Sequence, residues 1–357
     1  MDLKRIVVRQ VKSKDIDSYL DAKIFKRERS VYLTSVWINR YSNFQGDIYI
    51  IEYCEDDKIQ LLLMAERKSF FGISYAVLCK DRYADYTTVA DHGNYYLTSI
   101  NHRELFSAIT EKMRVHFVLF NNLLIDKATS QNIHCGSGYQ FLLKKEASYY
   151  YDCTKVIPPD SYFNQSQKKK GKDLIRLRKK IQDGMKYVTK ELSMVSEEEF
   201  CQYVKFKKEN LESRNVNSQK IDPLFLFLQR LKTESHVDFK ILFQALMKEN
   251  AIMAAHIGIM HNNTFFYLWP TYDVLYNKYS IGLILLEDII KDLTDSGVGK
   301  IDFGNGNEKY KQWFNNGENY NIAGFYSPNT LAGKFLYKCV SILFSSVYMQ
   351  KLLKNIL

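Results

Sequence analysis

The sequence predicts an α+β protein made of two copies of one unit, each with a mixed, largely antiparallel sheet flanked by helices. Three observations support this fold class. The chain has 357 residues, more than one hydrophobic core of ordinary size holds, so two domains are expected. Both halves show helical patterns, a meander of alternating strands, a helix and a further strand. The aromatic content of 14% suits cores rich in strands.

The domain boundaries follow from a change in composition. Residues 158–161 read Pro-Pro-Asp-Ser, which combines residues that break an element with residues that cap a helix. A basic segment follows, and then the second half repeats the first in outline. We therefore expect an N-terminal domain, a basic linker helix, a C-terminal domain and an amphipathic terminal helix. These segments cover residues 1–155, 156–185, 186–330 and 331–357.

The net charge of +10 and the pI near 9.0 favour an anionic partner: a cofactor with a nucleotide, a nucleic acid or an anionic membrane surface. Much of the charge lies in the basic helix, where Leu174, Leu177 and Ile181 form an apolar stripe. Two interpretations are open for this helix. It is a solvent-facing helix packed through its stripe, or it contacts phosphate or anionic lipid.

The chain is expected to be cytoplasmic. Its six cysteines are scattered, without a CxxC pair or histidines at ligand spacing, so neither a disulfide scaffold nor a metal site is predicted. The N-terminal apolar run is soon broken by charge, unlike a signal peptide or a membrane span. The terminal helix is expected to pack on the protein. The alternative is an interfacial helix that holds the protein at the periphery of the inner membrane.

Residues 300–314 form the most distinctive stretch of the sequence. An alternating strand enters a turn with two glycines, and an acid, a tyrosine and a lysine follow closely. Glycine turns with clustered ionisable groups at a strand end are frequent positions for functional sites. The alternative is an ordinary exit from a strand into a solvated loop. The residues concerned are Asp302, Gly304, Gly306, Glu308, Tyr310 and Lys311.

Three further motifs precede this stretch, and together they carry a resemblance. They are Ala254–Gly258 (AAHIG), Trp269–Asp273 (WPTYD) and Tyr279–Leu283 (YSIGL), ahead of DxGxGxxxYK at Asp302–Lys311. With the basic helix and the Asp85-Tyr86 pair, they resemble the GNAT-type acyltransferases of the cellulose-biosynthesis (CelD-like) group, which is related to the FemAB transferases. The resemblance covers about residues 30 to 315.

The resemblance implies tandem GNAT-like domains. It also implies transfer of an acyl group from acyl-CoA, without a metal, to an amine or hydroxyl of a sugar, nucleotide-sugar or lipid-linked saccharide in bacterial surface-polysaccharide or glycoconjugate assembly. The donor site would lie in the C-terminal domain. The phosphate loop departs from the Arg/Gln-x-x-Gly-x-Gly/Ala pattern, but a helix start after Ser280 still offers N–H groups to a pyrophosphate. The residues expected to bind acyl-CoA are Tyr279, Ser280, Gly282, Leu283 and Lys311.

Acyl transfer needs a base, donors for the oxyanion and an acid for the leaving thiolate. His256 follows small residues on a predicted central strand and is a candidate base, or else a hydrogen-bonded core histidine. Asp302 would orient it, or stabilise the glycine turn. Tyr310 would protonate the thiolate or position the acceptor, or else be a buried tyrosine with a satisfied hydroxyl. The residues expected to contact the acceptor substrate are Asp85, Tyr86, Tyr272, Asp273 and Glu308.

Two other functions are weighed against this one. The basic helix and the altered phosphate loop also suit a FemAB-like transferase that uses aminoacyl-tRNA on a cell-wall precursor. No long helical-hairpin arm is evident in the sequence, so tRNA ranks below the saccharide as a partner. The third hypothesis is a catalytically inactive GNAT-like scaffold of a polysaccharide-synthesis complex.

Overall fold

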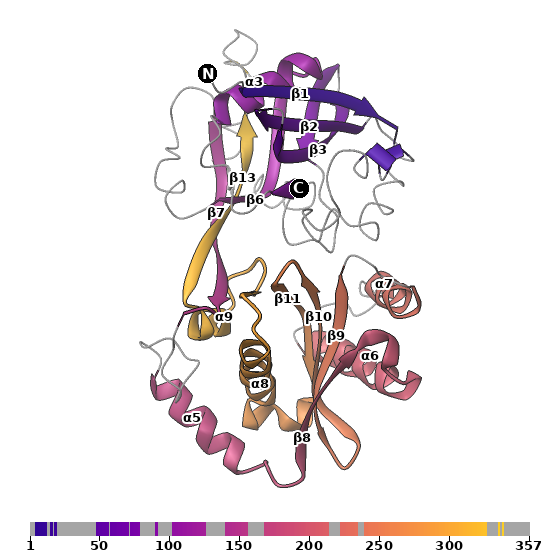
Figure 1. The fold of residues 1–357 in the computed structure, drawn as a ribbon, viewed down its shortest axis with the longest axis vertical. Coiled ribbons are helices and arrows are strands. Elements are labelled where there is room, and N and C mark those ends of the chain that lie inside the picture. The colour runs from indigo at the N-terminus through magenta and orange to yellow at the C-terminus, as the bar shows by residue number, and fades with distance from the viewer. Residues whose placement is uncertain are drawn as a thin grey trace. The chain divides into compact units, whose positions relative to one another are not determined.

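A computed structural model shows the chain as two compact units (Figure 1). Unit 1 comprises residues 1–148 and 319–357, and unit 2 comprises residues 149–318. Unit 2 is therefore an insertion in the chain of unit 1. The residues whose structure is described are 4–12, 15–16, 18–19, 48–56, 58–70, 72–78, 90–91, 102–125, 140–155, 168–213, 222–234, 239–326, 335 and 338.

Unit 1 is built on a sheet with the strand order β1-β2-β3-β4-β6-β13. Strands β1 to β4 pair antiparallel, and β6 runs parallel to β4 after helix α3. The short β5 pairs with β3. The bounds are β1 Lys4–Val11, β2 Ile48–Glu55, β3 Lys58–Phe70, β4 Ile73–Leu78, β5 Ala90–Asp91, α3 His102–Lys112, β6 Phe117–Ile125 and β13 Gly317–Tyr326.

The core of unit 1 lies between this sheet and α3. Strand β4 alternates between exposed and buried positions, so Ala76 and Leu78 point inward. Helix α3 buries Leu105 and Phe106 against them, and the Phe106 ring stacks on Phe120 with 5.1 Å between centroids. The apolar face of the helix and the inner face of the sheet thus form one contiguous cluster.

Unit 2 has the strand order β7-β12-β11-β10-β9-β8, where β7 belongs to the unit only from Tyr149 on. Its strands β8 to β11 pair antiparallel, and β12 runs parallel to β11 after helix α8. The strands are β7 Gln140–Asp152, β8 Met185–Glu191, β9 Lys240–Lys248, β10 Ala251–His261, β11 Thr264–Tyr272 and β12 Lys300–Asp302. The helices are α5 Lys168–Lys179, η5 Leu192–Met194, α6 Glu197–Glu212, α7 Asp222–Thr233, η7 Val274–Tyr279, α8 Ile281–Asp295 and α9 Lys309–Phe314.

Helices cover both faces of the unit 2 sheet (Figure 1). Both α6 and α8 pack against β10 and β11, and β10 is buried without interruption over residues 252–259. A strand with both faces buried needs a layer on each side. Helix α6 starts at a capping box in which Ser196 and Glu199 satisfy each other's backbone N–H. Helix α8 turns apolar side chains such as Ile281, Leu285 and Ile289 to the sheet.

The two units repeat one succession of elements, as the sequence predicts. In unit 1 the strands β2, β3 and β4 lead through α3 to a strand parallel to β4, and in unit 2 the strands β9, β10 and β11 lead through α8 to a strand parallel to β11. The α+β class, with mixed sheets flanked by helices, is confirmed. Of the predicted terminal helix, only Phe335 and Lys338 are among the described residues. No helix in the described ranges is long and apolar enough to cross a membrane.

Candidate functional site

The start of α8 brings several of the predicted donor-binding residues together. Ser280 ends η7 and precedes α8 with a left-handed φ of 53°. Its carbonyl accepts the N–H of Leu283 at 2.9 Å. Gly282 lies under the ring of Tyr272, since a Cβ there would be 3.4 Å from Tyr272 Cδ1. The first turn holds no acidic residue, and the first N–H groups of a helix have no partner within it. Tyr279 precedes them, with Lys278 Nζ 5.1 Å from its ring centre.

Arg178 fastens the basic helix α5 to α8. Its guanidinium donates to Ile284 O at 3.1 Å and forms ion pairs with Glu287 at 3.0 Å and Asp288 at 2.8 Å. Burial lowers the pKa of Arg178, but the hydrogen bonds and charges of Asp288 and Glu287 outweigh it and raise the pKa overall. Leu174 on the predicted apolar stripe is buried. The outer face of α5 exposes Lys169, Lys170, Lys172, Arg176 and Lys179.

The glycine turn after β12 is held by its own charged side chains. Asp302 is buried, and its Oδ1 accepts the N–H of Gly304 at 2.8 Å, which is the turn-stabilising interpretation of this residue. Lys311 is also buried and donates from Nζ to the carbonyl of Asn305 at 2.6 Å. Its ammonium lies 2.9 Å from Glu308 Oε2. Lys311 and Glu308 therefore pair with each other across the turn.

His256 lies in the interior of unit 2 with both ring nitrogens hydrogen-bonded. Its side chain is 0% exposed. Nε2 accepts the backbone N–H of Leu268 at 3.1 Å, and Nδ1 lies 3.1 Å from Gln244 Oε1. Burial, and after it the charge of Lys207, hold the pKa of His256 well below its usual value, so the ring is neutral. This is the geometry of a hydrogen-bonded core histidine, the second of the two interpretations of this residue.

Aromatic contacts connect His256 to Tyr310. The imidazole stacks on the ring of Tyr267, with 4.0 Å between centroids and 6° between planes. Tyr267 in turn meets the half-buried Tyr310 edge to face at 6.3 Å. Burial raises the pKa of Tyr267. The structure thus links two of the predicted catalytic residues through a ring that the sequence analysis did not single out, while Asp302 stays within the turn.

The structure describes three of the predicted acceptor-binding residues, each in a different local setting. Asp273 caps η7, where its Oδ1 accepts the N–H of Leu275 at 2.9 Å. Tyr272 packs at the start of α8, and Glu308 belongs to the glycine turn. Asp85 and Tyr86 lie outside the described residues. Their roles stay predictions.

A stripe of polar residues on α6 was missed by sequence reasoning. Tyr203 donates to Trp269 O at 2.9 Å and Lys207 to Pro270 O at 2.7 Å. Asn210 donates from Nδ2 to the carbonyls of Phe206 and Tyr272. Its Oδ1 is buried without a hydrogen-bond partner. The helical spacing of Tyr203, Lys207 and Asn210 among apolar residues is the signal that would have found the stripe.

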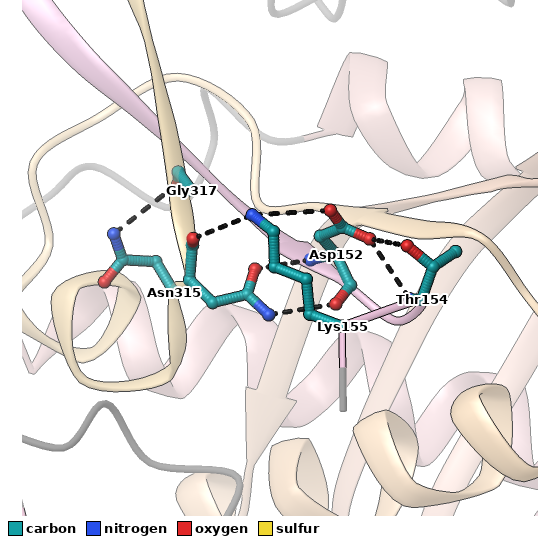
Figure 2. Close-up of polar contacts among 6 residues, drawn as sticks. Asp152, Thr154, Lys155, Asn315 and Gly317 are labelled. Atoms are coloured by element: carbon teal, nitrogen blue, oxygen red, sulfur yellow. Dashed lines mark hydrogen bonds and ion pairs between the residues drawn. The ribbon is translucent and has the colours of Figure 1, made fainter. Parts of the chain in front are cut away.

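Figure 2 shows a second set of contacts that the sequence analysis did not anticipate. The side-chain amide of Asn316 accepts the N–H of Asp152 at 2.6 Å and donates to its carbonyl at 2.9 Å. Lys155 lies 3.4 Å from the Asp152 carboxylate, and Thr154 donates to it. Burial raises the pKa of Asp152, but the hydrogen bonds from Thr154 and the contact with Lys155 outweigh it and lower the pKa. These contacts fix the chain after α9 to the end of β7.

Comparisons with known proteins agree with this fold. Residues 168–312 match the sequence profile of a family described as an acetyltransferase (GNAT) domain. The structure is similar to FemX, with a TM-score of 0.54 at 11% identity, over 94% of this chain and 99% of that chain. It is also similar to a domain of Agrobacterium fabrum described as the C-terminal domain of a lysylphosphatidylglycerol synthetase, with a TM-score of 0.50 at 14% identity, over 93% and 98% of the chains. A protein of unknown function from Bacteroides thetaiotaomicron gives a TM-score of 0.50 at 11% identity, over 89% and 99%.

No curated protein matches the chain. At such low identities the similar structures establish the fold alone, whereas the profile match covers α5, the strands β8 to β12, the glycine turn and the start of α8. Residues 168–312 therefore match the GNAT acetyltransferase family, and these residues lie within unit 2.

Proposed function

We propose that unit 2 transfers an acyl group from a coenzyme A thioester to an amine, or a hydroxyl, of a sugar, nucleotide-sugar or lipid-linked saccharide. The observation that carries the proposal is the start of α8 inside a GNAT domain: a left-handed residue followed by a helix of 15 residues with no acid in its first turn. A helix start is a binding site for phosphate, because its N–H groups and its dipole both favour an anion. The pyrophosphate of acyl-CoA has that chemistry.

The basic helix α5 supports the same assignment. Arg178 holds α5 beside α8, and α5 also packs against η7, which leads into Ser280. Lys169, Lys170 and Lys172 are exposed at the other end of α5. Cations in this region would attract a polyanionic donor and raise its rate of association. In this proposal the lysines of α5 attract the donor but take no part in the chemical step.

The transfer itself needs few groups. The acceptor nitrogen forms a bond to the thioester carbonyl carbon and gives up one proton to solvent, while the carbon–sulfur bond breaks and the leaving thiolate gains a proton. Tyr310 is our proposed acid, because it is half-buried on α9 and its ring meets that of Tyr267, on which His256 stacks. His256 is less suited to be the base, since Leu268 and Gln244 occupy its two nitrogens. We therefore propose that it acts by position.

The saccharide acceptor and a part in surface-polysaccharide assembly rest on the resemblance to the cellulose-biosynthesis group. A peripheral contact with an anionic membrane is part of the same proposal. The alternative, an aminoacyl-tRNA-dependent transferase, is favoured by the exposed cations of α5, since nucleic-acid backbones bind such surfaces. The inactive scaffold is the remaining alternative.

Calorimetry with acetyl-CoA and with a longer acyl-CoA tests the donor, using a matched pair of variants at the start of α8. Gly282→Glu and Gly282→Gln add nearly the same volume beside Tyr272, but only the glutamate puts a negative charge next to the pyrophosphate. We expect the wild type to bind acyl-CoA and Gly282→Glu to bind about tenfold more weakly than Gly282→Gln. Both variants should stay folded, because a carboxylate at a helix start is favourable.

Other outcomes would redirect the proposal. Absence of binding to every acyl-CoA would remove coenzyme A as the donor. Binding of tRNA that weakens steeply with added salt would then favour the aminoacyl-tRNA alternative. If neither acyl-CoA nor tRNA binds, the result favours the inactive scaffold.

A further inference from the structure

A chain of hydrogen bonds crosses the sheet of unit 2 from β11 to α8, with Gln244 and His256 fully buried and Tyr187 and Asp292 half-buried. We infer that this chain, formed by His256, Gln244, Tyr187 and Asp292, is a positioning device that fixes the bulge of β11 beside the donor site. The link to the donor site rests on the proposed function, whereas the link to the bulge does not. The members come from β10, β9, β8 and α8, so residues far apart in the sequence act together.

Every bond in the chain points the same way. Leu268 N–H donates to His256 Nε2 at 3.1 Å, and His256 Nδ1 lies 3.1 Å from Gln244 Oε1. Gln244 Nε2 donates to the Tyr187 hydroxyl at 3.3 Å, and that hydroxyl donates to Asp292 Oδ2 at 3.0 Å. The bonds thus begin at a backbone N–H and end at a carboxylate.

The two ends determine the proton on every member between them. A backbone N–H only donates, so His256 Nε2 must accept and the ring proton must lie on Nδ1. Gln244 then accepts with its oxygen and donates with its nitrogen. A carboxylate oxygen accepts, so the Tyr187 hydroxyl donates its hydrogen bond to Asp292. Reversing any one bond would bring two donors or two acceptors face to face, and the chain therefore specifies one arrangement of these side chains.

The first bond lies at an irregular point of the sheet. In the register of β10 and β11, Ile257 pairs with Trp269 and Gly258 pairs with Tyr267, so Leu268 is the extra residue of a β-bulge. A bulged residue loses its place in the ladder of backbone hydrogen bonds. The imidazole of His256 supplies the acceptor that the ladder does not. The sequence leaves room for the ring, since a Cβ on Gly258 would lie 2.6 Å from His256 Cε1.

The bulge matters for the proposed site because of what lies on either side of it. Tyr267, directly before Leu268, stacks on His256 and meets the proposed acid Tyr310. After the bulge, β11 continues to Tyr272, which packs on Gly282 at the start of α8. The other end of the hydrogen-bond chain, Asp292, lies on α8 itself. The chain therefore fixes the strand and the helix to each other and sets the distance between the acid and the phosphate-binding end.

The test uses nuclear magnetic resonance and calorimetry on the full chain. Gln244→Leu keeps the approximate volume and removes the middle link, and Tyr187→Phe removes only the hydroxyl. Thr189→Val is the matched control, because Thr189 pairs with Gln244 on β8 but is exposed and outside the chain. The wild type, with 15N-labelled leucine and histidine, should show a nitrogen–nitrogen coupling between Leu268 and His256 Nε2 through the hydrogen bond. Because the coupling reports on this one hydrogen bond, a change in packing elsewhere in the protein would not remove it.

We expect the Leu268 amide to exchange with solvent about tenfold faster in Gln244→Leu than in the control, with a smaller change in Tyr187→Phe. Affinity for acetyl-CoA should fall about tenfold in Gln244→Leu. A wild type without the coupling would overturn the inference, and so would a Gln244→Leu variant that matches the control in exchange and affinity. A protein that shows the coupling and the exchange changes but binds no acyl-CoA would refute the proposed function and still support the positioning of the bulge.

Discussion

Helices α3 and α8 hold the same position in the two units, each between a strand and its parallel neighbour, but their first turns differ. Helix α3 carries Glu104 in its first turn, whereas α8 has no acidic residue there. A carboxylate at a helix start interacts with the same dipole that would attract a phosphate. The fold is thus repeated in the two units, while the charge at the start of the helix is not.

The sheets differ in the same sense. In unit 1, Ile51 on β2 lies opposite Leu63 on β3, and both are apolar and fully buried. In unit 2, the corresponding strands β9 and β10 pair Gln244 with His256, and both are fully buried. Buried polar pairs cost free energy unless they are satisfied. Unit 2 thus carries a polar arrangement that its fold does not require, and we expect substitutions there to have the larger consequences.

The largest expected effect is that of Gly258→Ala. The new Cβ would lie 2.4 Å from the Phe265 ring and 2.8 Å from the carbonyl of Phe266, so strands must move. We expect the free energy of unfolding to fall by about 3 kcal/mol, as measured by urea denaturation. Gly72→Ala in unit 1 is the control: its φ is 77° with nothing within 4 Å of the Cβ, and it should cost about 1 kcal/mol. Equal losses would contradict the tight packing around His256.

Arg178→Met should have the next largest effect. It leaves Glu287 and Asp288 without their cation, and because these side chains are only partly buried we expect a loss of about 2 kcal/mol in unfolding free energy. Arg178→Lys keeps the charge but cannot reach several acceptors at once, and should lose less. Thermal unfolding of both variants measures these losses. An unchanged stability in Arg178→Met would mean that Arg178 does not stabilise the packing of α5 against α8.

The neutral state of His256 predicts a dependence of stability on pH. Its pKa in the folded chain lies well below 6.5, its unperturbed value. Below about pH 6.5 the unfolded chain therefore binds a proton that the folded chain does not, and the free energy of unfolding falls by about 1.4 kcal/mol per pH unit. Above pH 6.5 the contribution is fully present. His256→Gln should lack this slope, and denaturation of both proteins between pH 5 and 8 compares them; parallel curves would refute a neutral His256.

The smallest effect is expected in unit 1. Glu104→Gln removes the acid from the first turn of α3, and we expect a loss of only about 0.5 kcal/mol in stability. It should leave acetyl-CoA binding as in the wild type, in contrast to Gly282→Glu in unit 2. Calorimetry measures the affinity for acetyl-CoA and the number of molecules bound per chain. A second molecule bound in Glu104→Gln would mean that unit 1 carries a latent donor site.

The sequence was sufficient for the repeated outline, the α+β class and the start of a helix after Ser280. These depend on local patterns of apolar residues and on the helix start, which neighbouring residues determine. The hydrogen bonds of His256 could not be predicted from the sequence. One partner of the imidazole is the N–H of a bulged residue, and the bulge depends on the register of two strands. Lys311 is a similar case, since its partners are a carbonyl of the glycine turn and the carboxylate of Glu308.

The insertion of unit 2 within unit 1 has a consequence for the order in which the protein matures on the ribosome. Strand β6 is complete at Ile125, but its partner β13 ends at Tyr326. During synthesis, the edge of β6 in the unit 1 sheet lacks its partner strand until β13 has been made. All residues of unit 2 have been made once residue 318 is added. We therefore expect unit 2 to fold first and unit 1 to complete its sheet last, with the edge of β6 exposed to misassociation during translation.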